Sequence, residues 1–335
     1  MEILMREEER TILFTKTPVR VCTAVFLLFL SAVFVSPALE TEEPKNKTLG
    51  VGAVQYEVKP KRYSSLNEFN RSVEDSVVTA VSKGAEVVVF PEYINVFLAF
   101  SREMEDLVKV ESIDEGLEVI GSDSVHRLLL ERSEEVGRLM DRIWGDLAEE
   151  NSVWIVAGSY FAEEGEKLYN RSAVYGPKGK RVHEQDKVAL TPFEEDVLNL
   201  SSGKREDADT FNVGGWDFAL TICRDTFFDR WNKKFEEADV WIDIKANGAE
   251  YNTQTAEKFE EALPERIDET EVPYGVTACL NGKIFELFWE GPSSIIRWKE
   301  SSDGEEEWEY IHKAEGANEE EILVEELLLS RDLDN

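Results

Sequence analysis

Three side chains with complementary chemistry are the starting point: the thiol of Cys223, the carboxyl of Glu92 and the amine of Lys187. Cys223 ends the apolar run at residues 218–222, and a polar, aromatic segment that predicts a helix follows it. The unpaired N–H groups at a helix start lower the pKa of a thiol and can hold an oxyanion. The pattern therefore indicates a nucleophile, with a small buried apolar residue as the alternative.

Glu92 follows EVVVF at residues 86–90, which predicts a buried strand. Open sheets place ligand sites at the carboxyl ends of strands, and a glutamate with a raised pKa there suits a general base. The alternative is a structural carboxylate with a satisfied partner.

Lys187 lies in a charged segment, residues 183–195. Beside a Cys–Glu pair its ammonium would stabilise an oxyanion, whereas alone it would be a solvated side chain.

The composition narrows the functional class. Asp and Glu number 70 against 37 Lys and Arg, a formal net charge of −33, which disfavours binding to nucleic acid. The chain has three histidines and three cysteines without CxxC spacing, so we expect neither a metal site nor a disulfide framework. We expect no cofactor either. Cys279 is predicted to be a core thiol, and both Cys223 and Cys279 to remain free.

The N-terminal segments predict export. Residues 21–39 are nearly all apolar and have about the length of a membrane-crossing helix. They also suit a signal peptide, because residues 36–38 resemble a small-residue cleavage site; a buried core helix is a third option. Basic residues before this run and acidic residues after it leave residues 1–20 in the cytoplasm. The remainder is then either anchored outside the cytoplasm or secreted or periplasmic after cleavage.

Residues 40–48 are predicted to be a polar linker and residues 49–335 a single globular domain. The domain opens with a β-α-β pattern, and residues 98–125 form an acidic, irregular excursion near the site. Because strands alternate with helices but several occur in consecutive pairs, we expect a mixed sheet between helix layers. Further strands are predicted at residues 154–160, 168–175, 216–223, 240–244, 276–280, 294–298 and 322–329, and further helices at 126–150, 227–237 and 256–267.

Taken together and in this order, the three residues and their neighbours resemble the nitrilase superfamily of carbon–nitrogen hydrolases. FPE at residues 90–92, DKVALTPFEE at 186–195 and TICRD at 221–225 look like the three catalytic segments of that family. The resemblance covers roughly residues 49–330 and implies a four-layer α-β-β-α sandwich that forms a homodimer or higher homo-oligomer.

The resemblance also implies roles. Glu92 would be the base, Lys187 the oxyanion stabiliser and Cys223 the nucleophile that forms a thioester acyl-enzyme. LTPFEE resembles the LVPFGE of apolipoprotein N-acyltransferases, which makes Glu195 the counterpart of a second glutamate near the site, with Glu194 as the fallback.

Arg224 stands where many relatives carry an aromatic residue that touches the substrate. It can recognise a carboxylate or form an ion pair with Asp225. The leading hypothesis is hydrolysis of a non-peptide amide in a small or medium linear substrate. An N-acyltransferase with the same triad is the alternative, ahead of nitrile hydrolysis and of a non-catalytic binding module.

Overall fold

The computed structural model describes residues 46–107, 109–300 and 306–330. The predicted segments 1–20 and 21–39 lie outside these residues, as does most of the predicted linker. The first strand begins at Asn46, so the last residues of that linker belong to the sheet. In the described part of the chain, no helix combines the length and the apolar character that a membrane span needs.

The strands form one hydrogen-bonded network in the order β5-β4-β3-β2-β1-β9-β8-β7-β6, with β13 beside β1, β10 and β11 beside β9, and β12 beside β11. In chain order they are β1 (Asn46–Val58), β2 (Val87–Phe90), β3 (Trp154–Glu164), β4 (Lys167–Tyr175), β5 (Arg181–Asp186), β6 (Phe211–Val213), β7 (Trp216–Ile222), β8 (Val240–Lys245), β9 (Tyr274–Ile284), β10 (Leu287–Trp289), β11 (Ser294–Glu300), β12 (Glu306–Lys313) and β13 (Glu321–Ser330). The α-helices are α1 (Leu66–Ser82), α2 (Met104–Leu107), α3 (Ile113–Ile120), α4 (Val125–Asn151), α5 (Asn232–Phe235), α6 (Thr253–Glu260) and α7 (Leu263–Thr270).

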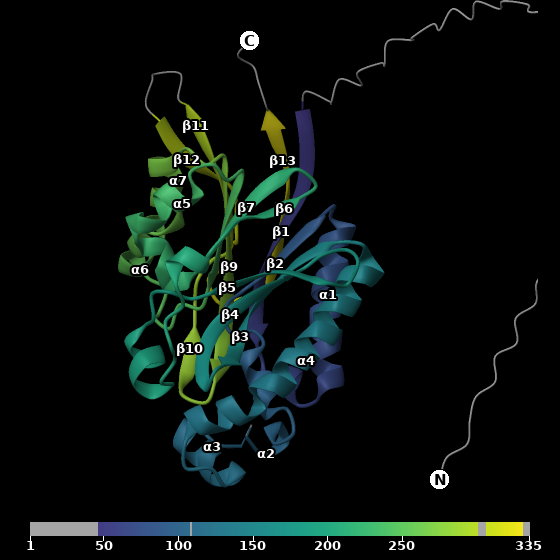
Figure 1. The fold of residues 1–335 in the computed structure, drawn as a ribbon, viewed down its shortest axis with the longest axis vertical. Helices are drawn as coiled ribbons and strands as arrows, with labels where there is room; N and C mark the ends of the chain where they lie inside the picture. Colours follow the sequence, from purple (N-terminus) through teal and green to yellow (C-terminus); the bar gives the residue numbers. More distant parts are fainter. Residues whose placement is uncertain (1–45, 108, 301–305, 331–335) are drawn as a thin grey trace, which may run out of the picture. The chain divides into compact units, whose positions relative to one another are not determined.

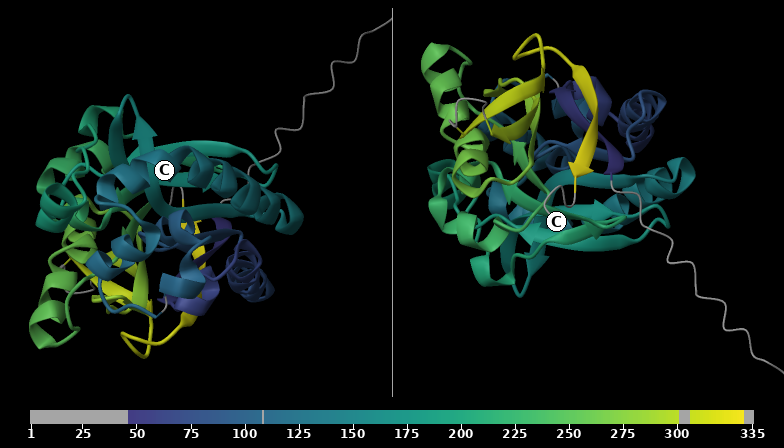
Figure 2. Two further views of the ribbon diagram at one scale, coloured as in Figure 1. Left: turned by 90° about the horizontal axis from the view of Figure 1, so that it is seen from below. Right: turned by 90° about the horizontal axis from the view of Figure 1, so that it is seen from above.

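The network folds over where β1 meets β9, which creates two half-sheets that face each other. β1 and β9 pair over only a short stretch, in which Tyr56 lies opposite Leu280 and Val58 opposite Gly282. Helices α1 and α4 cover the outer face of the half-sheet around β1–β5, and α5 to α7 cover the outer face of the other half (Figure 1). The views along the perpendicular direction show the two helix groups on opposite sides (Figure 2).

Alternation along the strands produces these layers. Successive side chains of a strand point to opposite faces, so Val87 and Val89 of β2 enter the core between the half-sheets, whereas Val88 enters the core under α1 and α4. A third core lies under α5 and α7 and contains Trp231 and Phe235. The predicted α-β-β-α sandwich is therefore confirmed.

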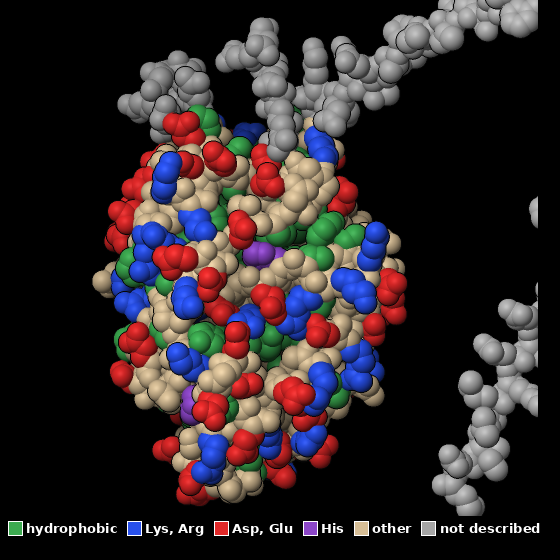
Figure 3. Space-filling model, in the orientation of Figure 1, with side chains coloured by type: hydrophobic (Ala, Val, Ile, Leu, Met, Phe, Trp, Pro, Cys, Tyr) green, Lys and Arg blue, Asp and Glu red, His purple; other side chains and the backbone are tan. Residues whose placement is uncertain are grey.

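Helix α1 illustrates how local signals set the outer layer. The hydroxyl of Ser65 accepts a hydrogen bond from the N–H of Glu68 at 3.2 Å, which caps the first turn. Phe69, Val73 and Val77 then recur at four-residue steps and are fully buried. The outward-facing charged residues of this and other elements are interspersed, with acidic and basic side chains mixed over the face in Figure 3.

Three predicted segments differ from the structure. The predicted helix at 227–237 is a series of short turns, because Phe228 is extended (φ −114°, ψ 123°) and interrupts it. The predicted helix at 256–267 is split into α6 and α7, and Pro264 occupies the first turn of α7, where its missing N–H is tolerated. The excursion at 98–125, predicted to be irregular, contains α2 and α3.

Candidate active site

The sandwich brings Glu92, Lys187 and Cys223 into one cavity of about 360 Å³. Glu92 lies just after β2 and Lys187 directly after β5, both in the first half-sheet, whereas Cys223 directly follows β7 in the second. Glu92 and Lys187 are buried, with 0% and 1% of their surface exposed, and Cys223 is half-buried. The cavity thus forms where the carboxyl ends of strands from both halves meet.

Sharp corners turn the chain at two of these strand ends. Cys223 has φ +52° and Tyr93, which follows Glu92, has φ +65°. This left-handed region is unfavourable for residues with a Cβ, and such strain concentrates at functional sites. The N–H of Cys223 donates to Oδ1 of Asp243 at 3.1 Å, which helps to hold the corner.

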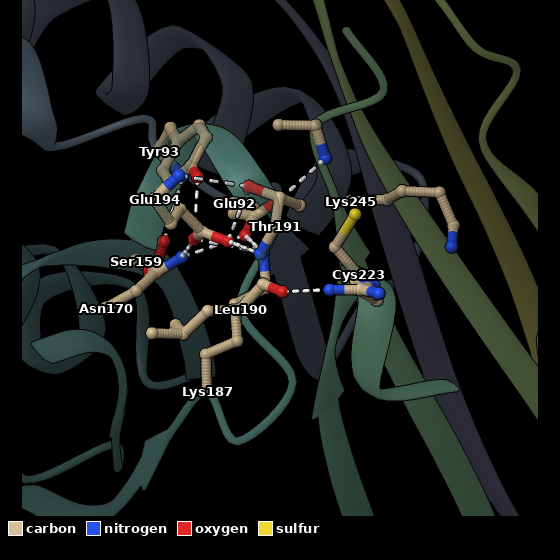
Figure 4. Close-up of polar contacts among 12 residues, drawn as sticks. Glu92, Tyr93, Ser159, Asn170, Lys187, Leu190, Thr191, Glu194, Cys223 and Lys245 are labelled. Carbon is tan, nitrogen blue, oxygen red and sulfur yellow. Dashed lines mark hydrogen bonds and ion pairs between the residues drawn. The ribbon is translucent and has the colours of Figure 1, made fainter. Parts of the chain in front are cut away.

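A buried network joins one ammonium to two carboxylates. Nζ of Lys187 lies 2.8 Å from Oε1 of Glu92 and 2.8 Å from Oε2 of Glu194. The side-chain amide of Asn170 donates to both glutamates, at 2.8 and 2.9 Å. Figure 4 shows these side chains converging, with the Cys223 sulfur between them and Lys245. The two carboxylates are therefore held side by side, and Glu92 shares the cavity with the thiol.

Other donors hold each carboxylate in place. Oε2 of Glu92 accepts the N–H of Ala246 at 3.0 Å. Oε2 of Glu194 accepts the N–H of Thr191 at 2.8 Å and its hydroxyl at 2.9 Å, and Tyr93 donates its hydroxyl to Oε1 at 2.7 Å. Glu194 thus accepts more hydrogen bonds than Glu92.

The surroundings push the pKa values of the two glutamates apart. Burial raises the pKa of Glu92, Lys187 lowers it and the charge of Glu194 raises it again, so the net shift is upward. Burial also raises the pKa of Glu194, but Lys187 and the donors Thr191 and Tyr93 outweigh it, so the net shift is downward. Opposite shifts in neighbouring carboxyls separate the group that exchanges a proton from the one that stays charged. Glu92 is the better base.

The amine and the thiol are shifted as well. Burial lowers the pKa of Lys187, but Glu92, Cys223 and Glu194 outweigh it, and the group stays an ammonium. Burial first and the charge of Glu92 second raise the pKa of the Cys223 thiol to about 12, against the opposing charges of Lys187 and Lys245. The expectation that the following helix lowers this pKa is therefore wrong: only a short 3₁₀ turn, Cys223–Phe227, follows the sulfur, and desolvation dominates. The thiol needs a base.

Sequence reasoning missed a second buried ion pair beside the thiol. Nζ of Lys245 lies 2.7 Å from Oδ2 of Asp243, and both side chains are buried. The ammonium also lies over the rings of Phe227 and Phe259, 5.1 and 5.4 Å from their centroids. The available signal was two charged residues at alternate positions of an otherwise apolar strand, VWIDIK.

The prediction for Glu195 is corrected by the structure. Glu195 is exposed, whereas Glu194 is fully buried at the network. Thr191 and Glu194 form a reciprocal capping box, in which the Thr191 hydroxyl also accepts the N–H of Glu194 at 3.3 Å. The T-x-x-E spacing at residues 191–194 was the local signal that selects Glu194.

Arg224 lies away from the charged network. Its side chain is exposed, and its guanidinium donates to the carbonyl of Leu190. The predicted ion pair is replaced by another arrangement, in which the Asp225 carboxylate accepts the N–H groups of Val188 and Ala189. Asp225 therefore supports the backbone that follows Lys187.

Cys279 behaves as predicted. It is buried in β9, its thiol donates to the carbonyl of Pro292 at 3.4 Å, and both it and Cys223 are free.

Solved structures with a similar fold include an amidase. The amidase from Nesterenkonia sp. AN1 in complex with acrylamide superposes with a TM-score of 0.60 and 16% identity, covering 83% of this chain and 90% of that one. A structure of an amidase from Nesterenkonia sp. has a TM-score of 0.59 at the same identity and coverage. At this identity the likeness concerns the fold.

The chain is also similar in sequence to a curated protein, the probable hydrolase YhcX of Bacillus subtilis (strain 168). The two are 28% identical over 176 residues, which is 52% of this chain and 29% of that protein. The match thus spans less than a third of the relative's length. The family model described as carbon-nitrogen hydrolase matches residues 50–261, and the chain belongs to this family.

Proposed function

We propose that this protein hydrolyses the carbon–nitrogen bond of a small or medium linear, non-peptide amide, with Cys223 as the nucleophile. The observation that carries the proposal is that Glu92 and Lys187 line the same cavity as the thiol, with Glu194 buried against Lys187. A protonated thiol, a carboxylate with a raised pKa and a permanent ammonium are the parts that acyl transfer to sulfur requires.

In the first half-reaction, Glu92 takes the thiol proton as the Cys223 sulfur attacks the carbonyl carbon. The electron pair of the carbonyl bond moves to oxygen, and Lys187 together with the N–H of Arg224 stabilises that oxyanion. The intermediate collapses, the carbon–nitrogen bond breaks, and Glu92 returns the proton to the departing nitrogen. The product is a thioester on Cys223 and a free amine or ammonia.

In the second half-reaction, Glu92 removes a proton from water as its oxygen attacks the thioester carbon. The thiolate departs, regains the proton from Glu92, and the carboxylic acid is released. Glu194 does not exchange a proton in this cycle. Its lowered pKa keeps it charged, so it holds Lys187 protonated and in position.

The test is release of ammonia or amine by the full chain from a panel of amides and nitriles, with Cys223→Ala as the comparison. We expect release from amides that falls at least about 10³-fold in the variant. Intact-mass measurement during turnover should show one acyl adduct on the wild type and none on Cys223→Ala. Undiminished release by Cys223→Ala would overturn the proposal. Release of the leaving ammonia or amine only when a second amine is supplied, with the acyl group found on that second amine and no free acid formed, would indicate acyl transfer instead.

A further inference from the structure

A second, apolar cavity adjoins the catalytic one. It has about 70 Å³ of free volume and shares Tyr93, Phe193 and Leu287 with the lining of the catalytic cavity. Figure 1 shows α2 and α3, which line it, beyond the lower ends of β10 and α4. The excursion between β2 and α4 thus lines a space that adjoins the catalytic cavity.

The walls of this cavity exclude polar occupants. Except for Tyr93 and the glycine Gly116, every lining residue has a hydrocarbon side chain, and the Tyr93 hydroxyl already donates to Glu194 at 2.7 Å. A buried water requires two to four polar partners, and an ammonium group requires more compensation still. The cavity therefore suits a hydrocarbon group.

We propose that this cavity binds the hydrocarbon end of the substrate's acyl chain, so that the preferred substrates are amides of medium-chain aliphatic acids. This inference rests on the proposed function. The acyl group stays attached to Cys223 until water releases it in the second half-reaction, so an apolar pocket that binds its chain acts in both half-reactions. The amine departs after the first half-reaction and becomes cationic in water, so it leaves on the solvent side of the catalytic cavity.

The free volume indicates the size of the group. An apolar cavity of about 150 Å³ accepts benzene. The apolar cavity here, with about 70 Å³, therefore has room for roughly three carbon atoms beyond the residues that it shares with the catalytic cavity. Gly116 of α3 keeps this space free. It is buried with ordinary helical backbone geometry, and a Cβ built on it would meet Cδ2 of Leu107 at 3.4 Å.

The test measures kcat/KM for linear primary amides from acetamide to decanamide. For wild type, each methylene that enters the cavity should raise kcat/KM about fourfold, until the cavity is full. Gly116→Leu fills the cavity and should abolish the rise of kcat/KM with chain length. Ile120→Ala enlarges the cavity and should move the optimum to longer chains, an effect that a folding defect would not produce. Val119→Leu, at an exposed position of the same helix, is the matched control.

Binding provides a second readout that does not depend on turnover. Calorimetry with Cys223→Ala should show affinity rising from acetamide to hexanamide, and adding Gly116→Leu should remove the rise. A flat series for wild-type turnover and for binding would overturn the inference, even if acetamide were hydrolysed. Chain-length-dependent binding without any Cys223-dependent amide hydrolysis would support the cavity and overturn the proposed function.

Discussion

Two buried lysines approach Cys223, and their partners differ. Lys187 contacts two carboxylates, Glu92 and Glu194, whereas Lys245 contacts one, Asp243. The first group has one carboxylate more than its ammonium can neutralise, so the charge of Glu194 adds to the burial that raises the pKa of Glu92. At the second, burial also raises the pKa of Asp243, and Lys245 together with the hydrogen bonds of Thr226 and Cys223 reduces the rise without reversing it.

The difference separates proton exchange from positioning. A group of two carboxylates and one ammonium can exchange a proton at moderate cost, because each carboxylate disfavours the charged form of the other. The pair of Lys245 and Asp243 has one charge of each sign, and Asp243 accepts the N–H of Cys223. We therefore assign the chemistry to the Lys187 group and the shape of the Cys223 corner to the Lys245 pair.

Glu92→Gln tests the first assignment and should have the largest effect. The glutamine oxygen can still accept a hydrogen bond from Lys187, but its NH2 group then faces the N–H of Ala246, and the side chain cannot take the thiol proton. We expect kcat to fall about 10³-fold and stability to fall by about 1–3 kcal/mol, because the buried N–H of Ala246 loses its acceptor. Steady-state kinetics and thermal unfolding measure the two effects. A loss below tenfold would move the base to another group.

Asp243→Asn tests the second assignment through stability. Loss of the carboxylate leaves Lys245 buried without its partner, which costs about 3–5 kcal/mol in the free energy of unfolding. Asp243→Asn combined with Lys245→Met should recover most of that loss, and denaturant titrations would measure both. In the double variant we expect kcat within about tenfold of wild type at an unchanged pH optimum. A shifted optimum would mean that Lys245 takes part in proton transfer.

Glu194→Gln and its exposed neighbour Glu195→Gln form a matched pair. Removing the charge of Glu194 makes ionisation of Glu92 easier, so the pKa of Glu92 falls. We expect the acid limb of the kcat/KM profile to move to lower pH and kcat to fall about tenfold. Glu195→Gln should leave kcat within about twofold of wild type and the acid limb of the profile at the same pH. Equal effects of the two changes would contradict the placement of Glu194 at the site.

Asp225 extends the comparison to a buried carboxylate held by backbone N–H groups instead of a lysine. Burial raises its pKa from 3.8 to about 7. Because the folded state then binds the proton more tightly than the unfolded state, the stabilisation is complete below pH 3.8 and is lost as pH rises through 7. Relative to Asp225→Asn, wild type should lose up to about 1.4 kcal/mol of stability per pH unit within this window. Denaturant titrations between pH 5 and 8 measure the difference, and a constant difference would contradict the shift.

Local patterns in the sequence predicted most strands and helices and two of the three candidate catalytic residues, whereas the four-layer arrangement followed from the family resemblance. The spacing of apolar residues along a strand or a helix shows which side of that element is buried, and this spacing can be recognised in the sequence. Glu92 and Cys223 were recognisable because each ends an apolar strand with a residue of unusual type for that place. Lys187 carried no such signal and was identified from its order between them, as part of a family resemblance. Export through residues 21–39 and homo-oligomer formation stay predictions.

The tertiary structure decided how these residues act. The pKa of Cys223 sums burial with the charges of Glu92, Lys187, Lys245 and Asp243, which come from both half-sheets, so no local pattern contains it. The choice of Glu194 over Glu195 depends on which side of a short turn faces Lys187. The apolar cavity needs α3 to lie against the turn before β10, residues far apart in the chain. A sequence records what each residue prefers, but charges and cavities depend on distances between segments that only the folded chain sets.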